Sequence, residues 1–220
     1  MKYVYILLSA TPSKFGKLIR CALNERYNHM SIALDDKFKE LYSFARKKNH
    51  LPLEAGFVIE DYYRFSLCKE VPINCRVYKI PLKEEQYEKL LISIDKVRND
   101  TSYVYNLFSA LSFPIFKGFY VKKAFTCVGF VAFLLNNAGF KLRKKPWKYS
   151  PNSLGIELEP YLYYVGELAD FNNFKENSNV NHSYFKKVNY IKKIWKSTQI
   201  LCIIAKRTLG KLFVVFEQNI

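Results

Sequence analysis

Two short segments of alternating polar and apolar residues, joined by a turn, constrain the fold more than any other feature of this sequence. In residues 28–35, Met30, Ile32 and Leu34 alternate with polar or small residues, and residues 40–45 alternate in the same way. Because the side chains of a strand point alternately to its two faces, each segment is predicted to be a strand. The turn residues Asp35-Asp36-Lys37 between them predict a hairpin.

Other patterns predict further strands and several helices. Strands are expected at residues 3–9, 57–60, 75–80 and 161–168. Helices are expected at 12–24 with Thr11 as the cap, from Pro81 to about Asn99, over 126–137, and briefly after Ser150. The aromatic segment 103–113 fits neither pattern. Half of the residues are hydrophobic, which excludes a wholly disordered chain.

The chain divides by composition into a domain, residues 1–172, and a basic linker and extension, residues 173–220. A length of 220 residues suits one domain with a tail. The extension holds nine Lys or Arg against two Glu, and its apolar run 212–216 is predicted to be a strand. We expect the extension to pack on the domain, with an anionic membrane surface as the alternative contact of this basic, amphipathic segment.

The net charge and the cysteines limit the class of protein. Lys and Arg number 35 against 19 Asp and Glu, a net charge of +16 that attracts polyanions. No phosphate-binding glycine loop, metalloprotease helix or nucleic-acid motif occurs, so nucleic acid is an unlikely partner. Five cysteines without a CxxC pair predict reduced thiols and no zinc site. The apolar runs are too short for a membrane span, and residues 3–10 read as a strand rather than a signal peptide. A cytoplasmic protein is expected, with peripheral association with a membrane as the alternative.

The segment 125–132 is the best candidate for chemistry. Cys127 would lie in the first turn of a helix, where free amide groups and the helix dipole favour a thiolate. Such a nucleophile needs a base. Of the three histidines, His29 lies on the polar face of its strand, whereas His50 and His182 lie in a basic loop and in the linker. The alternatives are that Cys127 is a small core residue and that His29 is a half-buried strand histidine.

Both segments resemble a known superfamily. Residues 27–35, Tyr-Asn-His-Met-Ser-Ile-Ala-Leu-Asp, resemble the histidine strand of the papain-like NlpC-type cysteine hydrolases, and residues 125–131, Phe-Thr-Cys-Val-Gly-Phe-Val, resemble their cysteine helix. The histidine comes first, so the resemblance is to the circularly permuted, YiiX-like branch, which is also similar to lecithin–retinol acyltransferases. Shorter matches at 5–9, 41–47, 56–58, 150–152 and 164–168 extend it over residues 1–172.

The resemblance implies an α+β fold in which an antiparallel, partly barrel-like sheet packs against the cysteine helix. His29 and Cys127 would meet at one end of that sheet. The family adds a polar residue that orients the imidazole, and Ser43 is the positional match, about opposite His29 if the hairpin turns near Asp36. Because a serine orients an imidazole less firmly than a carboxylate, Glu40 and Glu60 stay as alternatives.

The implied activity is that of a cysteine hydrolase or acyltransferase acting on an amide or ester of a peptide, a cell-wall peptide or a lipid, without a cofactor or metal. Tyr103 or Tyr105 could line the pocket, although both suit the core as well. The basic clusters 46–48 and 122–123 lie near the site segments and could select an acidic substrate. The alternative function is a non-catalytic protein of the same fold that binds a polyanion or a membrane surface.

Overall fold

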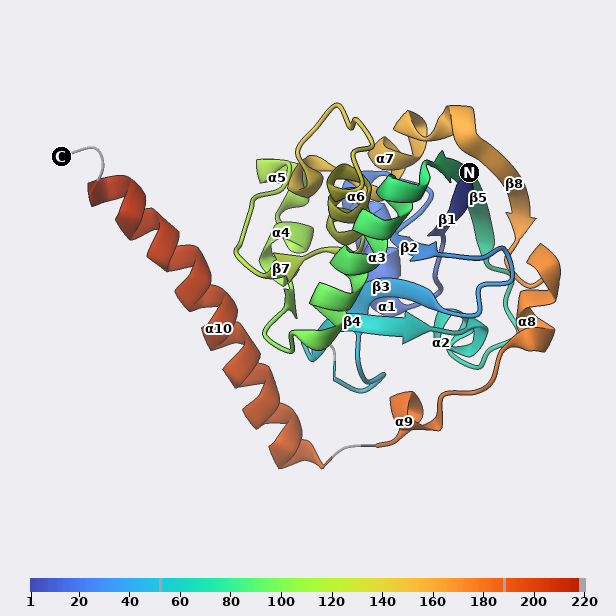
Figure 1. Ribbon diagram of the computed structural model, residues 1–220. Coiled ribbons are helices and arrows are strands. Elements are labelled where there is room, and N and C mark those ends of the chain that lie inside the picture. The colour runs from blue at the N-terminus through green and yellow to red at the C-terminus, as the bar shows by residue number, and fades with distance from the viewer. Residues whose placement is uncertain (52, 188, 218–220) are drawn as a thin grey trace.

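The computed structural model describes residues 1–51, 53–187 and 189–217, and its centre is a six-stranded antiparallel sheet. The strand order is β4-β3-β2-β1-β5-β8 (Figure 1). The strands are β1 (Lys2–Ser9), β2 (His29–Ala33), β3 (Leu41–Arg46), β4 (Ala55–Glu60), β5 (Asn74–Leu82) and β8 (Leu162–Glu167). A separate parallel pair joins β6 (Val104–Tyr105) to β7 (Ala124–Phe125). The large sheet is open, with β4 and β8 at its edges, and does not close into a barrel.

Helices cover the sheet and fill the connections between its strands. They are α1 (Lys14–Leu23), α2 (Tyr62–Ser66), α3 (Glu84–Asn99), α4 (Leu107–Leu111), α5 (Phe113–Phe116), α6 (Cys127–Asn137), α7 (Pro151–Glu157), α8 (Phe174–Asn177), α9 (His182–Phe185) and α10 (Tyr190–Glu217). Short 3₁₀ turns lie at Pro146–Lys148, Glu159–Tyr161 and Phe171–Asn173. The α+β class and the antiparallel sheet expected from the sequence are confirmed.

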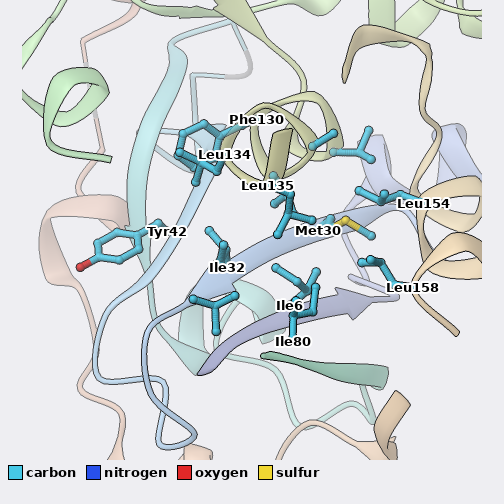
Figure 2. Close-up of a cluster of buried hydrophobic side chains, with 14 of the residues drawn as sticks. Ile6, Met30, Ile32, Tyr42, Ile80, Phe130, Leu134, Leu135, Leu154 and Leu158 are labelled. Carbon is cyan, nitrogen blue, oxygen red and sulfur yellow. The ribbon is translucent and has the colours of Figure 1, made fainter. Parts of the chain in front are cut away.

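The main core lies between one face of the sheet and helices α3 and α6. Met30 and Ile32 of β2 point into this core, as the alternating pattern predicts, and Phe130, Leu134 and Leu135 of α6 meet them there (Figure 2). Each of these side chains is fully buried. The expected packing of the cysteine helix on the sheet is therefore confirmed, and it fixes where α6 begins relative to β2.

The opposite face of the sheet carries a second core. Ala33 of β2 belongs to it, together with aromatic side chains from α2 and from the segment after β8. Phe38 stacks on Phe171, with the ring centroids 4.8 Å apart, and meets Phe174 edge-on. Phe174 lies beyond residue 172, so the chain continues to contribute buried side chains past the boundary drawn from composition.

Local details differ from the sequence prediction for identifiable reasons. Ser13, not Thr11, caps α1, because its hydroxyl accepts a hydrogen bond from the amide of Gly16. Pro81 does not begin a helix. It lies in β5 opposite Tyr3, because pairing with β1 continues to Leu82, and α3 begins only at Glu84. Helix α2 was not expected, since five residues are too few for a helical repeat to show.

The predicted strand at residues 212–216 is wrong, because these residues belong to the 28-residue helix α10. A short apolar run fits either structure by pattern alone, and here it continues a helix that starts at Tyr190. Helix α10 extends from the compact body (Figure 1). It is joined to the body through Arg207, which donates hydrogen bonds to the carbonyls of Ser102 and Lys123, and through the buried Ile204. Within the described part of the chain, no helix has the length and apolar character needed to cross a membrane.

Candidate active site

Cys127 is the first residue of α6 and lies close to the start of β2. Thr126 caps the helix in an extended conformation, and its hydroxyl accepts a hydrogen bond from the amide of Gly129 at 3.0 Å. A Cβ at position 129 would meet that hydroxyl at 3.0 Å, so a glycine here lets the cap approach closely. The Sγ atom of Cys127 lies 4.0 Å from the carbonyl oxygen of Asn28, the residue before His29. The cap therefore places the thiol beside the start of β2.

His29 is the first residue of β2 and pairs with Ser9 at the end of β1. It lies on the face of the strand opposite Met30 and is 9% exposed. Its Nε2 atom is 2.7 Å from Oε2 of Glu60, the last residue of β4. The hydroxyl of Ser31 donates to the same Glu60 oxygen at 2.7 Å. Glu60 is thus the closest polar partner of His29. It is one of the two acidic residues that the sequence left open as alternatives to Ser43.

His29 and Glu60 each shift the pKa of the other toward its charged form. Burial lowers the pKa of His29, but the charge and hydrogen bond of Glu60 and the neighbouring Cys127 thiol together outweigh burial, and the pKa rises to about 10. Burial raises the pKa of Glu60, yet the charge and hydrogen bond of His29, the charge of Arg64 and the hydrogen bond from Ser31 together hold that pKa below its ordinary value. At neutral pH the structure therefore favours an imidazolium facing a carboxylate.

Ser43 lies near His29 but is turned mainly to the backbone. Its Oγ atom is 3.3 Å from Nε2 of His29, and it donates a hydrogen bond to the carbonyl of Met30 at 3.0 Å. Ile32 pairs with Tyr42, so the same register places Ser43 opposite Ser31 and not opposite His29. The reason is that the turn between β2 and β3 is centred one residue later than expected. Ser43 thus belongs to the polar cluster without being the nearest group to the imidazole.

Glu40, the other acidic alternative, lies elsewhere. Its carboxylate accepts hydrogen bonds from the hydroxyl of Tyr42 and from Arg98, whose Nη2 atom is 3.2 Å away. Tyr42 belongs to the core on the α6 side of the sheet, whereas His29 lies on the other side of β2. Glu40 therefore takes no part in the cluster around His29.

His29, Glu60 and Cys127 line one cleft, with an empty volume of about 700 Å³, at the end of the sheet where β2 begins. Residues from the neighbouring ends of β1, β3 and β4 complete its wall, among them Thr11, Arg46 and Ala55. A second, smaller and more apolar pocket of about 330 Å³ also reaches Cys127. Its lining includes Ile19, Leu23, Ala110, Phe113 and Val128. Cys127, which is 5% exposed, thus lies between a polar cleft and an apolar pocket.

Of the two tyrosines named from the sequence, only Tyr105 lies at the site. It lines both pockets, and its pKa is raised by burial and by the neighbouring Cys127 thiol. Tyr103 instead stacks on Phe125, with ring centroids 5.6 Å apart and an angle of 8° between the rings. It is packed against the main core.

Two further residues of the cleft wall, Arg64 and Tyr184, have no local signal in the sequence. The guanidinium of Arg64 lies over the ring of Tyr184 at 4.0 Å from its centroid, and Arg64 donates to the carbonyl of Arg46 at 2.6 Å. Its Nε atom is buried and has no hydrogen-bond partner among the described residues. Tyr184 belongs to α9, in the extension, and its carbonyl accepts from the amide of Asn49. The extension therefore supplies part of the cleft, a contribution that its linker-like composition does not reveal.

The remaining histidines and cysteines lie apart from this cluster. His50 and His182 are exposed, as are Cys21, Cys68 and Cys202. Cys75 is buried in the second core, and burial raises its pKa to about 12. Over residues 1–51, 53–187 and 189–217, no three His, Cys, Asp or Glu side chains gather in a way that could hold a metal ion.

Comparisons with protein-family models, with curated proteins and with solved structures found no match.

Proposed function

We propose that this protein is a cysteine hydrolase or acyltransferase of the permuted papain-like type, with Cys127 as the nucleophile. The observation that supports the proposal best is the shared cleft: a cysteine at a capped helix start and a histidine paired with a buried carboxylate line one opening. A nucleophile, a base and a group that orients the base, in that order, are what thiol acyl transfer needs.

The reaction would proceed in two steps. The sulfur of Cys127 attacks the carbonyl carbon of an amide or ester, and the bond to the leaving group breaks as His29 gives that group its proton. The acyl group is then held as a thioester. Water or another acceptor attacks the thioester carbonyl, gives its proton to His29 and releases the acyl group and the thiolate.

Each role has a structural basis. Because Nε2 of His29 faces Glu60, Nδ1 is the ring nitrogen left for the sulfur and the leaving group. The first amides of a helix have no partner within it, and Thr126 takes the amide of Gly129. The amides of Cys127 and Val128 are therefore the donors proposed to stabilise the oxyanion.

The two openings at Cys127 suggest the form of the substrate. The apolar pocket suits an apolar acyl group or side chain, whose burial would favour binding by roughly 25 cal/mol per Å². The cleft on the side of His29 carries Arg46 and the partly unsatisfied Arg64, which suit an acidic group. We propose a substrate with an apolar acyl part and a polar or acidic leaving part.

The experiment that tests this proposal is capture of the acyl-enzyme. The protein is incubated with p-nitrophenyl esters of increasing chain length, and the acylated peptide is identified by mass spectrometry. The proposal is supported if Cys127 is the acylated residue and if ester turnover is lost in Cys127→Ala and in His29→Ala but kept in Cys75→Ala. Ester turnover that is unchanged in Cys127→Ala, or an absence of any acyl adduct at Cys127, would overturn it and favour the non-catalytic alternative.

A further inference from the structure

A group of large apolar side chains is exposed on helices α4 and α5 and just after them. Leu111 is 47% exposed, Ile115 77%, Phe116 62% and Tyr120 42%. All four lie within ten residues of chain. Single exposed apolar residues are common on protein surfaces, but a local group of this kind usually marks a contact surface.

A basic turn lies directly against this group. Lys148 Nζ donates a hydrogen bond to the carbonyl of Phe116 at 3.3 Å. Gly118, with φ +79°, approaches the turn so closely that a Cβ there would lie 2.0 Å from the carbonyl oxygen of Trp147. The rings of Tyr120 and Trp147 are also in contact, with centroids 5.0 Å apart. The turn at Pro146–Lys148 and the end of α5 therefore form one surface.

The charged side chains that this segment of the chain contributes are all basic, although the carboxylates of Glu25 and Glu157 accept hydrogen bonds at its border, from Ser150 and Tyr149. Residues 101–156 contain eight Lys or Arg and no Asp or Glu. Lys117, Lys144, Lys145 and Lys148, all exposed, line one cavity together with Phe113. We call this surface the α5 patch; it consists of Leu111, Ile115, Phe116, Lys117, Tyr120, Lys144, Lys145, Trp147 and Lys148.

The α5 patch lies beside the candidate active site. Phe113 and Ser150 line both the lysine cavity and the apolar pocket that reaches Cys127. Any partner that covers the patch would therefore stand next to the opening of that pocket.

We propose that the α5 patch docks on an anionic phospholipid bilayer. Exposed Ile and Phe side chains enter the acyl boundary, Trp and Tyr rings suit the headgroup level, and lysines beside them attract anionic headgroups. The patch presents all three on one surface, and its charge is complementary to that of the bilayer. The inference does not depend on catalysis by Cys127, because docking concerns a different set of side chains.

Vesicle binding tests the inference. The full chain is sedimented with phosphatidylcholine vesicles that contain or lack phosphatidylglycerol, at low and high salt. We expect binding only to the anionic vesicles, weakened by salt. Ile115→Ser with Phe116→Ser, and separately Lys144→Gln with Lys145→Gln, should each weaken binding on the order of tenfold or more. The matched controls Ile92→Ser and Lys96→Gln, exposed positions on α3, should leave binding unchanged.

Tryptophan fluorescence separates the patch from helix α10, which is also basic and carries the exposed Trp195. The chain has two tryptophans, so Trp195→Phe leaves only Trp147. A blue shift of Trp147 emission with anionic vesicles supports the inference. The inference is overturned if the full chain does not bind anionic vesicles, or if both double variants bind like the unaltered chain. It is also overturned if anionic vesicles shift the emission of Trp195 in Trp147→Phe but leave the emission of Trp147 in Trp195→Phe unchanged.

Discussion

Nε2 of His29 lies 2.7 Å from Oε2 of Glu60, although the two residues come from strands that are separated by β3. Both side chains are nearly buried, with 11% and 6% of their surfaces exposed. A buried pair of this kind holds the imidazole charged and in one orientation, which is the condition that the proposed chemistry requires.

Replacement of Glu60 by Gln should lower the pKa of His29. The carboxylate is the largest cause of the upward shift, and without it burial favours the neutral ring. NMR titration of His29 measures the change directly, and alkylation of Cys127 should slow in the same variant. Ser43→Ala serves as the control: it removes a hydroxyl bonded to the Met30 carbonyl and should cost only about 1 kcal/mol of stability. A larger fall in the pKa of His29 in Ser43→Ala than in Glu60→Gln would contradict the assignment.

The pair should also make stability depend on pH in a defined window. His29, whose pKa is raised, contributes stability below its ordinary value of 6.5 that is lost as pH rises toward about 10. Glu60, whose pKa is lowered, contributes stability above its ordinary value of 4.5 that is lost as pH falls. The excess stability of the unaltered chain over the double variant His29→Gln, Glu60→Gln should therefore be largest between about pH 4.5 and 6.5. Urea unfolding at several pH values measures it, and a difference that grows from pH 7 to 10 would argue against the pair.

Thr126→Ala should destabilise the start of α6 by about 1 kcal/mol, because the amide of Gly129 loses its acceptor. Thr126→Ser keeps the hydroxyl and is the matched control. Chemical denaturation measures the stability. If α6 positions the thiol, Thr126→Ala should in addition slow the reaction of Cys127 with small electrophiles, and equal rates in both variants would show that the cap does not position it.

Tyr184→Ala should open the cleft. The ring of Tyr184 lies in the cleft wall against Arg64, so its removal should speed the reaction of Cys127 with bulky maleimides more than with iodoacetamide. Phe185→Ala, next to it on α9, is the comparison. Equal acceleration of both reagents, or none, would mean that Tyr184 does not limit access.

The sequence carried enough information for the sheet and for the start of α6. The β2–β3 hairpin and the cysteine helix follow from regular alternation and from a capped apolar run, which are local signals. The partner of His29 was not determined in the same way, because Glu60 comes from β4, thirty-one residues away, and reaches the ring across β3. Positional reasoning on the hairpin alone favoured Ser43, and a shift of one residue in the turn moved it beside Ser31.

The structure of the extension, residues 173–220, was also only partly predictable from the sequence. Its composition indicates a linker and a basic tail, yet Tyr184 reaches the cleft, and residues 212–216 continue a helix where an apolar run suggested a strand. Such contacts depend on how distant segments meet in space, and a short aromatic or apolar run carries no local sign of its partner.

The most direct test of the central claim, that Cys127 and His29 form a reactive pair, is the rate at which iodoacetamide alkylates Cys127 near neutral pH. Cys21, Cys68 and Cys202 are exposed and are replaced by serine, which leaves Cys75 as an internal comparison whose raised pKa keeps it a thiol. Peptide mass spectrometry follows both sites. We predict that Cys127 reacts at least about tenfold faster than a simple free thiol and far faster than Cys75, and that His29→Ala removes this excess. A rate at Cys127 no higher than that of the free thiol, and unchanged in His29→Ala, would contradict the account.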